Sequence, residues 1–201
     1  MLRRAIGLGA VLTMLGSAGV LAQETGTPYF HAPYRAFERH EFGATLSFPS
    51  GGTAIEGFYR FGAGQLDLGL RGGVLDPDEP GGRTTVILGV SGRDQVITHS
   101  EDFPLDGAIV LGVGALLVED NSRLLVPLGL SLGRRLNIED SPVSIVPFAE
   151  PLLFADIGSD FDLRVALGLG GDFRLSRSFD VRVAVGVGDL EGIAVSAAWI
   201  R

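Results

Sequence analysis

The chain has 201 residues, 30 of them glycine, with no cysteine and a formal net charge of −8. The lack of cysteine excludes disulfides and a lipid-modified N-terminal cysteine, and the acidic balance argues against a nucleic-acid partner. This length suits one domain with a full core or one closed barrel.

Residues 1–22 are predicted to be a secretory signal peptide. Arg3 and Arg4 supply its positive end, an apolar stretch follows, and small residues precede a cleavage point near Ala22. The alternative is an uncleaved anchor, because residues 5–22 are barely long enough to span a bilayer. Cleavage would change the formal charge from −8 to −10, since both arginines are lost.

Residues 23–38 show no hydrophobic period and contain Pro28 and Pro33. They are predicted to form a periplasmic lead-in to a transmembrane domain that covers residues 39–201. Within that domain, apolar residues alternate with small or polar ones in short segments separated by turn signals. Because successive side chains of a strand point to opposite faces, a period of two predicts β-strands.

The expected strands cover about residues 41–48, 55–61, 66–71, 84–92, 109–117, 124–133, 143–154, 160–174, 178–188 and 192–201. Residues 93–103 are either a long turn or a short extra strand. Three prolines, Pro127, Pro147 and Pro151, lie inside expected strands. Proline cannot donate to a strand ladder, so these positions indicate bulges.

The clearest alternation runs through two successive strands between Phe161 and Val187. One face is large and apolar, and the other carries glycine, alanine and paired charges. The large set is Phe161, Leu163, Val165, Leu167, Leu169, Phe179, Val181, Val183, Val185 and Val187. This contrast is typical of a barrel with lipid outside and a polar lumen inside. We therefore predict an all-β protein, a closed up-and-down antiparallel transmembrane β-barrel of about ten strands. Eight strands are the alternative if the weak fourth or seventh segment fails.

Two sets of side chains are predicted from this arrangement. Aromatic residues near strand ends would form girdles at the membrane interfaces: Phe42, Phe48, Phe61, Phe148, Phe154, Phe161, Phe173, Phe179 and Trp199. Charged residues on the inward parity would form a polar network in the lumen: Glu41, Arg60, Asp67, Arg71, Asp162, Arg164, Asp172, Arg174, Asp180 and Arg182. Opposite charges on neighbouring strands can pair, so the network either fills the lumen or lines a thin solute path.

The sequence contains no pattern that indicates catalysis. His31, His40 and His99 are expected in the lead-in, at the base of the first strand and in a periplasmic connection. There is no Ser/His/Asp spacing, no metal-ligand cluster and no phosphate-binding loop. We expect no enzyme activity, no metal and no cofactor.

Over residues 39–201 the chain resembles the small outer-membrane β-barrel families of Gram-negative bacteria, the OmpA-like barrels and their relatives. The resemblance rests on the signal peptide, the repeated alternation and the last strand, where Ile193, Val195, Ala197 and Trp199 alternate before Ile200 and Arg201. It implies a location in the outer membrane, with lipids and the barrel-assembly machinery as partners.

The predicted function is that of an integral outer-membrane barrel with a structural or narrow-pore, porin-like role. The alternative is a soluble periplasmic barrel, lipocalin-like, that binds an apolar ligand. Both alternate with a period of two, but a soluble barrel would expose the glycine-rich face. The chain has no lysine, whereas soluble surfaces usually mix Lys and Glu, which favours the membrane barrel.

Overall fold

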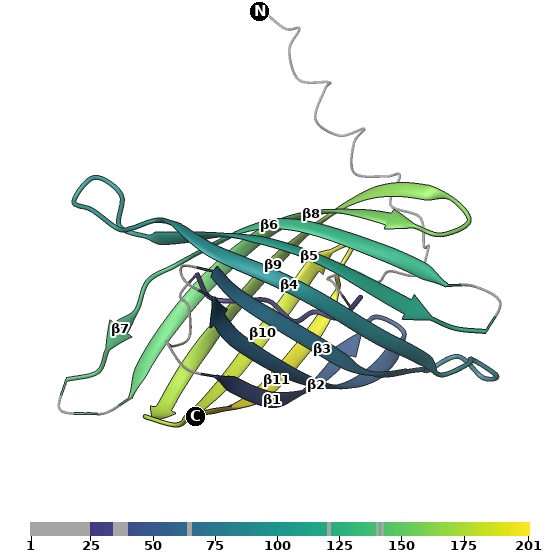
Figure 1. The fold of residues 1–201 in the computed structure, drawn as a ribbon, viewed down its shortest axis with the longest axis horizontal. Coiled ribbons are helices and arrows are strands. Elements are labelled where there is room, and N and C mark those ends of the chain that lie inside the picture. The colour runs from purple at the N-terminus through teal and green to yellow at the C-terminus, as the bar shows by residue number, and fades with distance from the viewer. Residues whose placement is uncertain (1–24, 34–39, 64–65, 120–121, 140, 142) are drawn as a thin grey trace, which may run out of the picture.

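The computed structural model describes residues 25–33, 40–63, 66–119, 122–139, 141 and 143–201. The predicted signal peptide lies outside these ranges. The regular elements are all β-strands (Figure 1): β1 (Glu41–Pro49), β2 (Gly52–Ala63), β3 (Leu66–Pro77), β4 (Thr85–Ile97), β5 (Asp106–Leu117), β6 (Arg123–Gly133), β7 (Leu136–Asn137), β8 (Ser144–Ile157), β9 (Phe161–Ser176), β10 (Phe179–Gly188) and β11 (Gly192–Ile200). In the part of the chain so described, no helix is long and apolar enough to cross a membrane.

Ten long strands close into an antiparallel barrel. Neighbours in sequence are neighbours in the sheet, β1 pairs with β11 from Glu41↔Ile200 to Pro49↔Gly192, and β6 pairs with β8. The two-residue β7 pairs only with β8. The prediction of a closed up-and-down barrel with ten strands is confirmed, and the eight-strand alternative is wrong.

Two uncertain segments of the sequence are strands. The first part of the ambiguous stretch continues β4 to Ile97, with a register irregularity between Gln95 and Ile97. The expected seventh strand is β8, and it runs unbroken through Pro147 and Pro151. The ladder between β6 and β8 nevertheless skips two positions, between the pairs Gly129↔Leu152 and Leu132↔Ala149. Proline therefore weakens the pairing without ending the strand.

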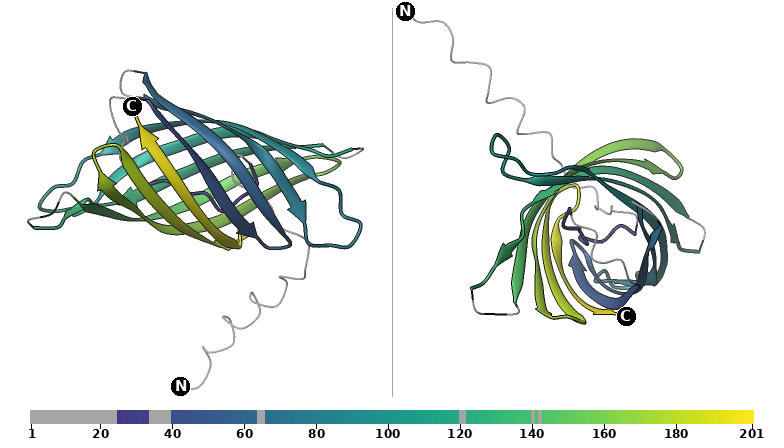
Figure 2. Two further views of the ribbon diagram at one scale, coloured as in Figure 1. Left: turned by 90° about the horizontal axis from the view of Figure 1, so that it is seen from below. Right: turned by 60° about the vertical axis from the view of Figure 1, so that its left-hand side comes forward.

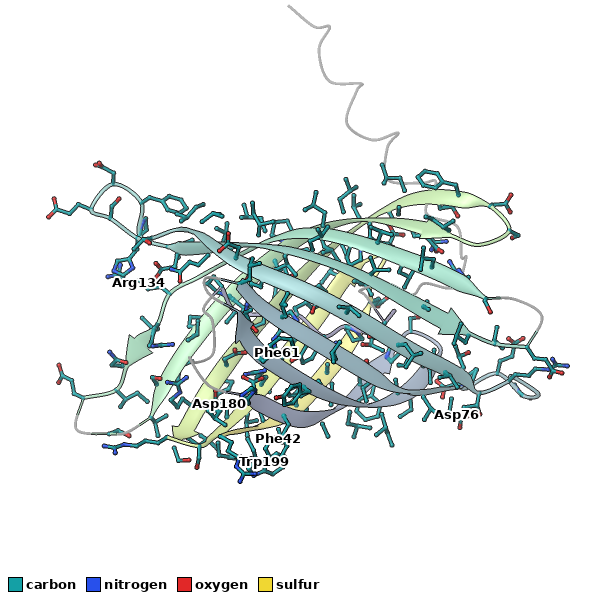
Figure 3. All side chains as sticks on the ribbon, in the orientation of Figure 1. Phe42, Phe61, Asp76, Arg134, Asp180 and Trp199 are labelled. Atoms are coloured by element: carbon teal, nitrogen blue, oxygen red, sulfur yellow. The ribbon has the colours of Figure 1, made fainter. Side chains whose placement is uncertain are left out.

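The barrel has two ends that differ in their connections. We call the end where β1 begins and β11 finishes the terminal end; it also holds residues 98–105, 134–139 and 177–178. The opposite, distal end holds residues 50–51, 78–84, 158–160 and 189–191. Phe42, Trp199 and Arg134 lie toward the terminal end, and Asp76 lies at the distal end (Figure 3).

The two faces of the strands are as the alternation predicts. Large apolar side chains point outward on every long strand; Leu167 is 39% exposed and Val183 is 36% exposed. On the same two strands, Arg182 points inward and is only 6% exposed. The distribution is the reverse of that in a soluble protein, because the apolar side chains lie outside and many of the charged side chains lie inside.

Residues 25–33, which we call the lumen segment, run inside the barrel (Figure 2, right). All nine are buried, with Tyr29 and Phe30 each 1% exposed. The prediction placed this segment in the periplasm, and for these nine residues the structure corrects it. The physical reason is space, because the inner wall presents glycine opposite the segment: a Cβ added at Gly168 would overlap the ring of Phe30.

Candidate functional site

The interior of the barrel has an apolar zone and a charged zone. Apolar inward side chains gather in the distal half and are at most 5% exposed: Ala54, Leu75, Ile87, Leu116, Leu125, Leu152, Phe154 and Leu190. Phe30 of the lumen segment belongs to this cluster. The charged side chains lie mainly in the middle and the terminal half, around the rest of the segment. The distal half of the lumen therefore contains a buried hydrophobic cluster, which the alternation of the sequence did not predict.

The first ionic cluster joins the strands on both sides of β11. Arg182 of β10 binds Glu41 of β1 through two bonds, Nη1–Oε1 at 2.5 Å and Nη2–Oε2 at 2.7 Å. Asp172 and Asp180 lie 3.5 Å and 3.9 Å from the same guanidinium. Arg174 lies 3.5 Å from Asp180. The two-pronged pairing with Glu41 is the strongest geometry that a guanidinium and a carboxylate can adopt.

Three further ion pairs link β2, β3 and β4. Asp67 accepts from Arg60 at 3.3 Å and also from Arg93. Glu56 lies 2.7 Å from Arg71. All five side chains are at least nine-tenths buried. Removing one partner from such a pair would leave a buried charge without compensation.

The last members of the predicted network lie apart from the others. Arg164 and Asp162 are near the distal end, 3.4 Å apart, and the Asp162 side chain is 61% exposed. Arg164 also lies 3.3 Å from Asp156, which Arg123 binds from the other side. The structure therefore distributes the predicted charges over separate clusters instead of one network.

Sequence reasoning missed several lumen residues: Glu56, Arg93, Arg123, Glu150 and Asp156. Glu56 shares the parity of Arg60, so the period of two could have included it. Arg93 lies just beyond the predicted end of its strand, and Glu150 lies in the irregular β8. Parity alone identifies such residues only where the strand boundary is known.

The main chain of the lumen segment is held by side chains of the wall. The backbone N–H of His31 donates to Glu150 Oε2 at 2.8 Å, and Ser131 Oγ donates to the His31 carbonyl. Arg93 donates to the carbonyl of Ala32. Buried backbone groups need partners, and here the partners come from β4, β6 and β8.

Side chains of the segment are bound as well. Thr27 donates to Glu56 Oε1 at 2.6 Å, and Arg182 donates to the Tyr29 hydroxyl at 3.3 Å. The Arg71 guanidinium lies 3.7 Å from the centre of the Tyr29 ring, within the range of a cation–π contact. Glu56 and Arg71 form one ion pair, and Arg182 belongs to the cluster around Glu41. The segment therefore connects two groups of charges that the sheet alone keeps apart.

The hydrogen bond of His31 fixes its protonation. His31 Nε2 lies 3.2 Å from Arg60 Nη1. A guanidinium nitrogen can only donate, so Nε2 must accept and the imidazole is neutral, with its proton on Nδ1. His31 was expected in a periplasmic lead-in; it is instead 3% exposed inside the barrel.

The predicted aromatic girdle is divided between the two faces. On the outside at the terminal end, the ring of Phe42 is 6.2 Å and that of Phe179 5.1 Å from the ring of Trp199. Phe61 and Phe173 are partly exposed on the same face, and Phe48 and Phe161 are exposed toward the distal end. Tyr59, which the prediction omitted, is 39% exposed beside Phe61.

Phe148 and Phe154 do not belong to the girdle. They point into the lumen, where they are 6% and 1% exposed. Both share the parity of Glu150, so they must lie on the same face of β8 as that carboxylate. The prediction was wrong because it used the distance from strand ends and not the face.

No arrangement that indicates a metal site occurs among the described residues, where no group of three or more His, Asp or Glu side chains could hold an ion. His40 lies outside the lumen, 2.5 Å from the Tyr59 hydroxyl, and His99 pairs with Asp106 at 2.9 Å. A small cavity lies at the terminal end of the lumen. It is lined by Ala32, Arg135, Ser144, Val146, Asp172, Arg174, Asp180 and Arg182.

A closed antiparallel barrel with an apolar exterior and a charged interior has the architecture of the membrane β-barrels. The structure is similar to the crystal structure of the beta domain of the Bordetella autotransporter BrkA, with a TM-score of 0.52 and 14% sequence identity. The match covers 80% of this chain and 96% of that one. No family model and no curated protein matches the chain. The likeness shows the fold, and the narrower OmpA-like assignment stays a prediction.

Proposed function

We propose that the protein is an integral barrel of the bacterial outer membrane with a structural role and a lumen closed to solutes. The observation that carries this proposal is the band of outward apolar side chains, which continues around all ten long strands. A surface of this kind is favourable in hydrocarbon and costly in water. Because the first strand begins and the last strand finishes at the terminal end, that end would face the periplasm.

The soluble alternative requires the reverse arrangement. A lipocalin-like barrel would keep Leu, Val and Phe inside to bind an apolar ligand. Here the interior holds Glu41, Arg60, Asp67 and Arg182, each at most 6% exposed, while Val90 and Leu111 are each 54% exposed. The apolar interior cluster at the distal end is already filled by side chains of this chain.

Of the two roles predicted for a membrane barrel, the filled lumen favours the structural one. The lumen segment, the ion pairs and the distal apolar cluster occupy the interior together. We propose no catalytic activity and no cofactor. The partners we propose are outer-membrane lipids and, during biogenesis, the barrel-assembly machinery. That machinery would recognise the outward side chains of Ile193, Val195 and Trp199 on β11.

The test is to express the full chain in a Gram-negative host and fractionate the cells. We expect it in the outer-membrane fraction after alkaline carbonate washing. We also expect a folded band in cold SDS that migrates differently after boiling. Recovery as a monomer from a detergent-free periplasmic extract would refute the proposal and favour the soluble barrel.

A further inference from the structure

The lumen carries a set of groups that bind an extended peptide through its main chain. Glu150, Ser131 and Arg93 bind three backbone groups of two consecutive residues, the His31 N–H and the carbonyls of His31 and Ala32. Ser131 and Glu150 are fully buried. Such contacts depend little on the identity of the peptide side chains, as in other sites where proteins bind a peptide backbone.

Specificity comes from the groups around two aromatic side chains. Tyr29 has Arg71 over its ring and Arg182 at its hydroxyl. Phe30 fits against Gly168 and Gly186, since a Cβ at Gly186 would lie 3.2 Å from the Phe30 ring. Thr27 adds a third anchor on Glu56. The wall is thus complementary to a short segment with adjacent aromatic residues.

The peptide-binding groups also coincide with one of the places where a ladder of the sheet is interrupted. Ser131 and Glu150 face each other at one of the two positions that the ladder between β6 and β8 skips. The bonds of His31 to both side chains bridge the two strands at that point. The bound segment therefore links strands whose direct pairing is interrupted.

We propose that the lumen is a binding site for an extended peptide, occupied in cis by residues 25–33. The same site would accept a peptide of this sequence in trans when the hold on the resident segment is weakened. This goes beyond the proposed structural role, and it depends on the barrel interior and not on the membrane around it.

The experiment uses the full chain in detergent, carrying Tyr29→Ala and Phe30→Ala. A fluorescently labelled synthetic peptide with the sequence of residues 25–33 is titrated in, and binding is followed by anisotropy. We expect saturable binding by this variant and none by the unchanged protein, whose site is filled. Phe103→Ala, which removes an aromatic side chain that is 41% exposed in a loop, is the matched control and should not bind the peptide.

Two further measurements make the result specific. A peptide with Ala in place of both aromatic residues should bind at least about tenfold more weakly, equivalent to about 1.4 kcal/mol. Adding Ser131→Ala to the double variant should weaken binding of the original peptide. Equal binding of a scrambled peptide, or a folded double variant that binds no peptide, would overturn the proposal.

Folding is checked separately by the shift between cold and boiled SDS samples. If the double variant does not fold, the single Phe30→Ala variant is tested in the same way. Loss of folding in both would show that the segment is an obligatory part of the core and not a ligand in a site, which also overturns the proposal. A barrel that folds and binds the peptide but is absent from the outer membrane would contradict only the proposed function.

Discussion

Substitution of Val90 by Arg tests which face of the barrel meets lipid. Val90 is the sixth of the 13 residues of β4, and it points outward between Leu70 and Val113 of the neighbouring strands. At about 3.3 Å per residue and a tilt of about 40°, such a strand spans roughly 33 Å along the barrel axis, more than the apolar band of about 25 Å. Val90 would then lie near the bilayer midplane, where an outward Arg costs about 2–4 kcal/mol.

The matched control is Val96→Arg, six residues further along β4 and 50% exposed near the terminal end. Near the interface the same change should cost about 0–1 kcal/mol. Both variants and the unchanged protein are unfolded with guanidinium chloride in liposomes, and their free energies of unfolding are compared. If the outer face met water, both substitutions would be ordinary surface changes within about 0.5 kcal/mol, and that result would refute the orientation.

Three other predictions follow from the lumen. Arg182→Leu should destabilise the barrel by about 3–5 kcal/mol because it leaves the buried Glu41 unpaired. Arg83→Leu, which breaks an exposed pair with Glu119, should cause no measurable loss; equal effects in denaturant titrations would contradict the buried pairing. Gly168→Val should destabilise the protein through overlap with Phe30, and Phe30→Ala should recover part of the loss, with a coupling of at least about 0.5 kcal/mol in the double-mutant cycle. The unchanged protein should give no stable conductance steps in planar bilayers, since its lumen is filled, and large steady steps would show an open path.

The strands and their faces could be predicted because a period of two records which side each residue occupies. The pairing of Arg182 with Asp172 across β9 and β10 follows from the same alternation once the hairpin is placed. What alternation does not record is register over longer distances. The register of β3 and β4 places Arg93 directly opposite Asp67. The expected strand ended one residue before Arg93, so this pair was not predicted.

Strand β8 shows where the alternation itself becomes ambiguous. Its inward face carries Phe148, Leu152 and Phe154 together with Glu150, and its outward face includes Pro147 and Pro151. Apolar residues thus occur on both faces, because the distal half of the lumen is a small hydrophobic core. A strand between lipid and an apolar core loses the contrast that reveals its parity.

The position of the lumen segment could not be read from residues 25–33, because a segment surrounded on every side has no polar and apolar face and so no period. The residues that indicate an occupied lumen lie on the barrel wall instead. A barrel of about eight strands has an interior just wide enough for its own side chains to fill. Ten strands enclose more space, and inward glycines such as Gly168 and Gly186 enlarge it further. A wider barrel with a glycine-lined wall must hold either water or more of the chain. The ion pairs around Tyr29 and His31 are buried, as expected when a segment of the chain fills the lumen in place of an open water column.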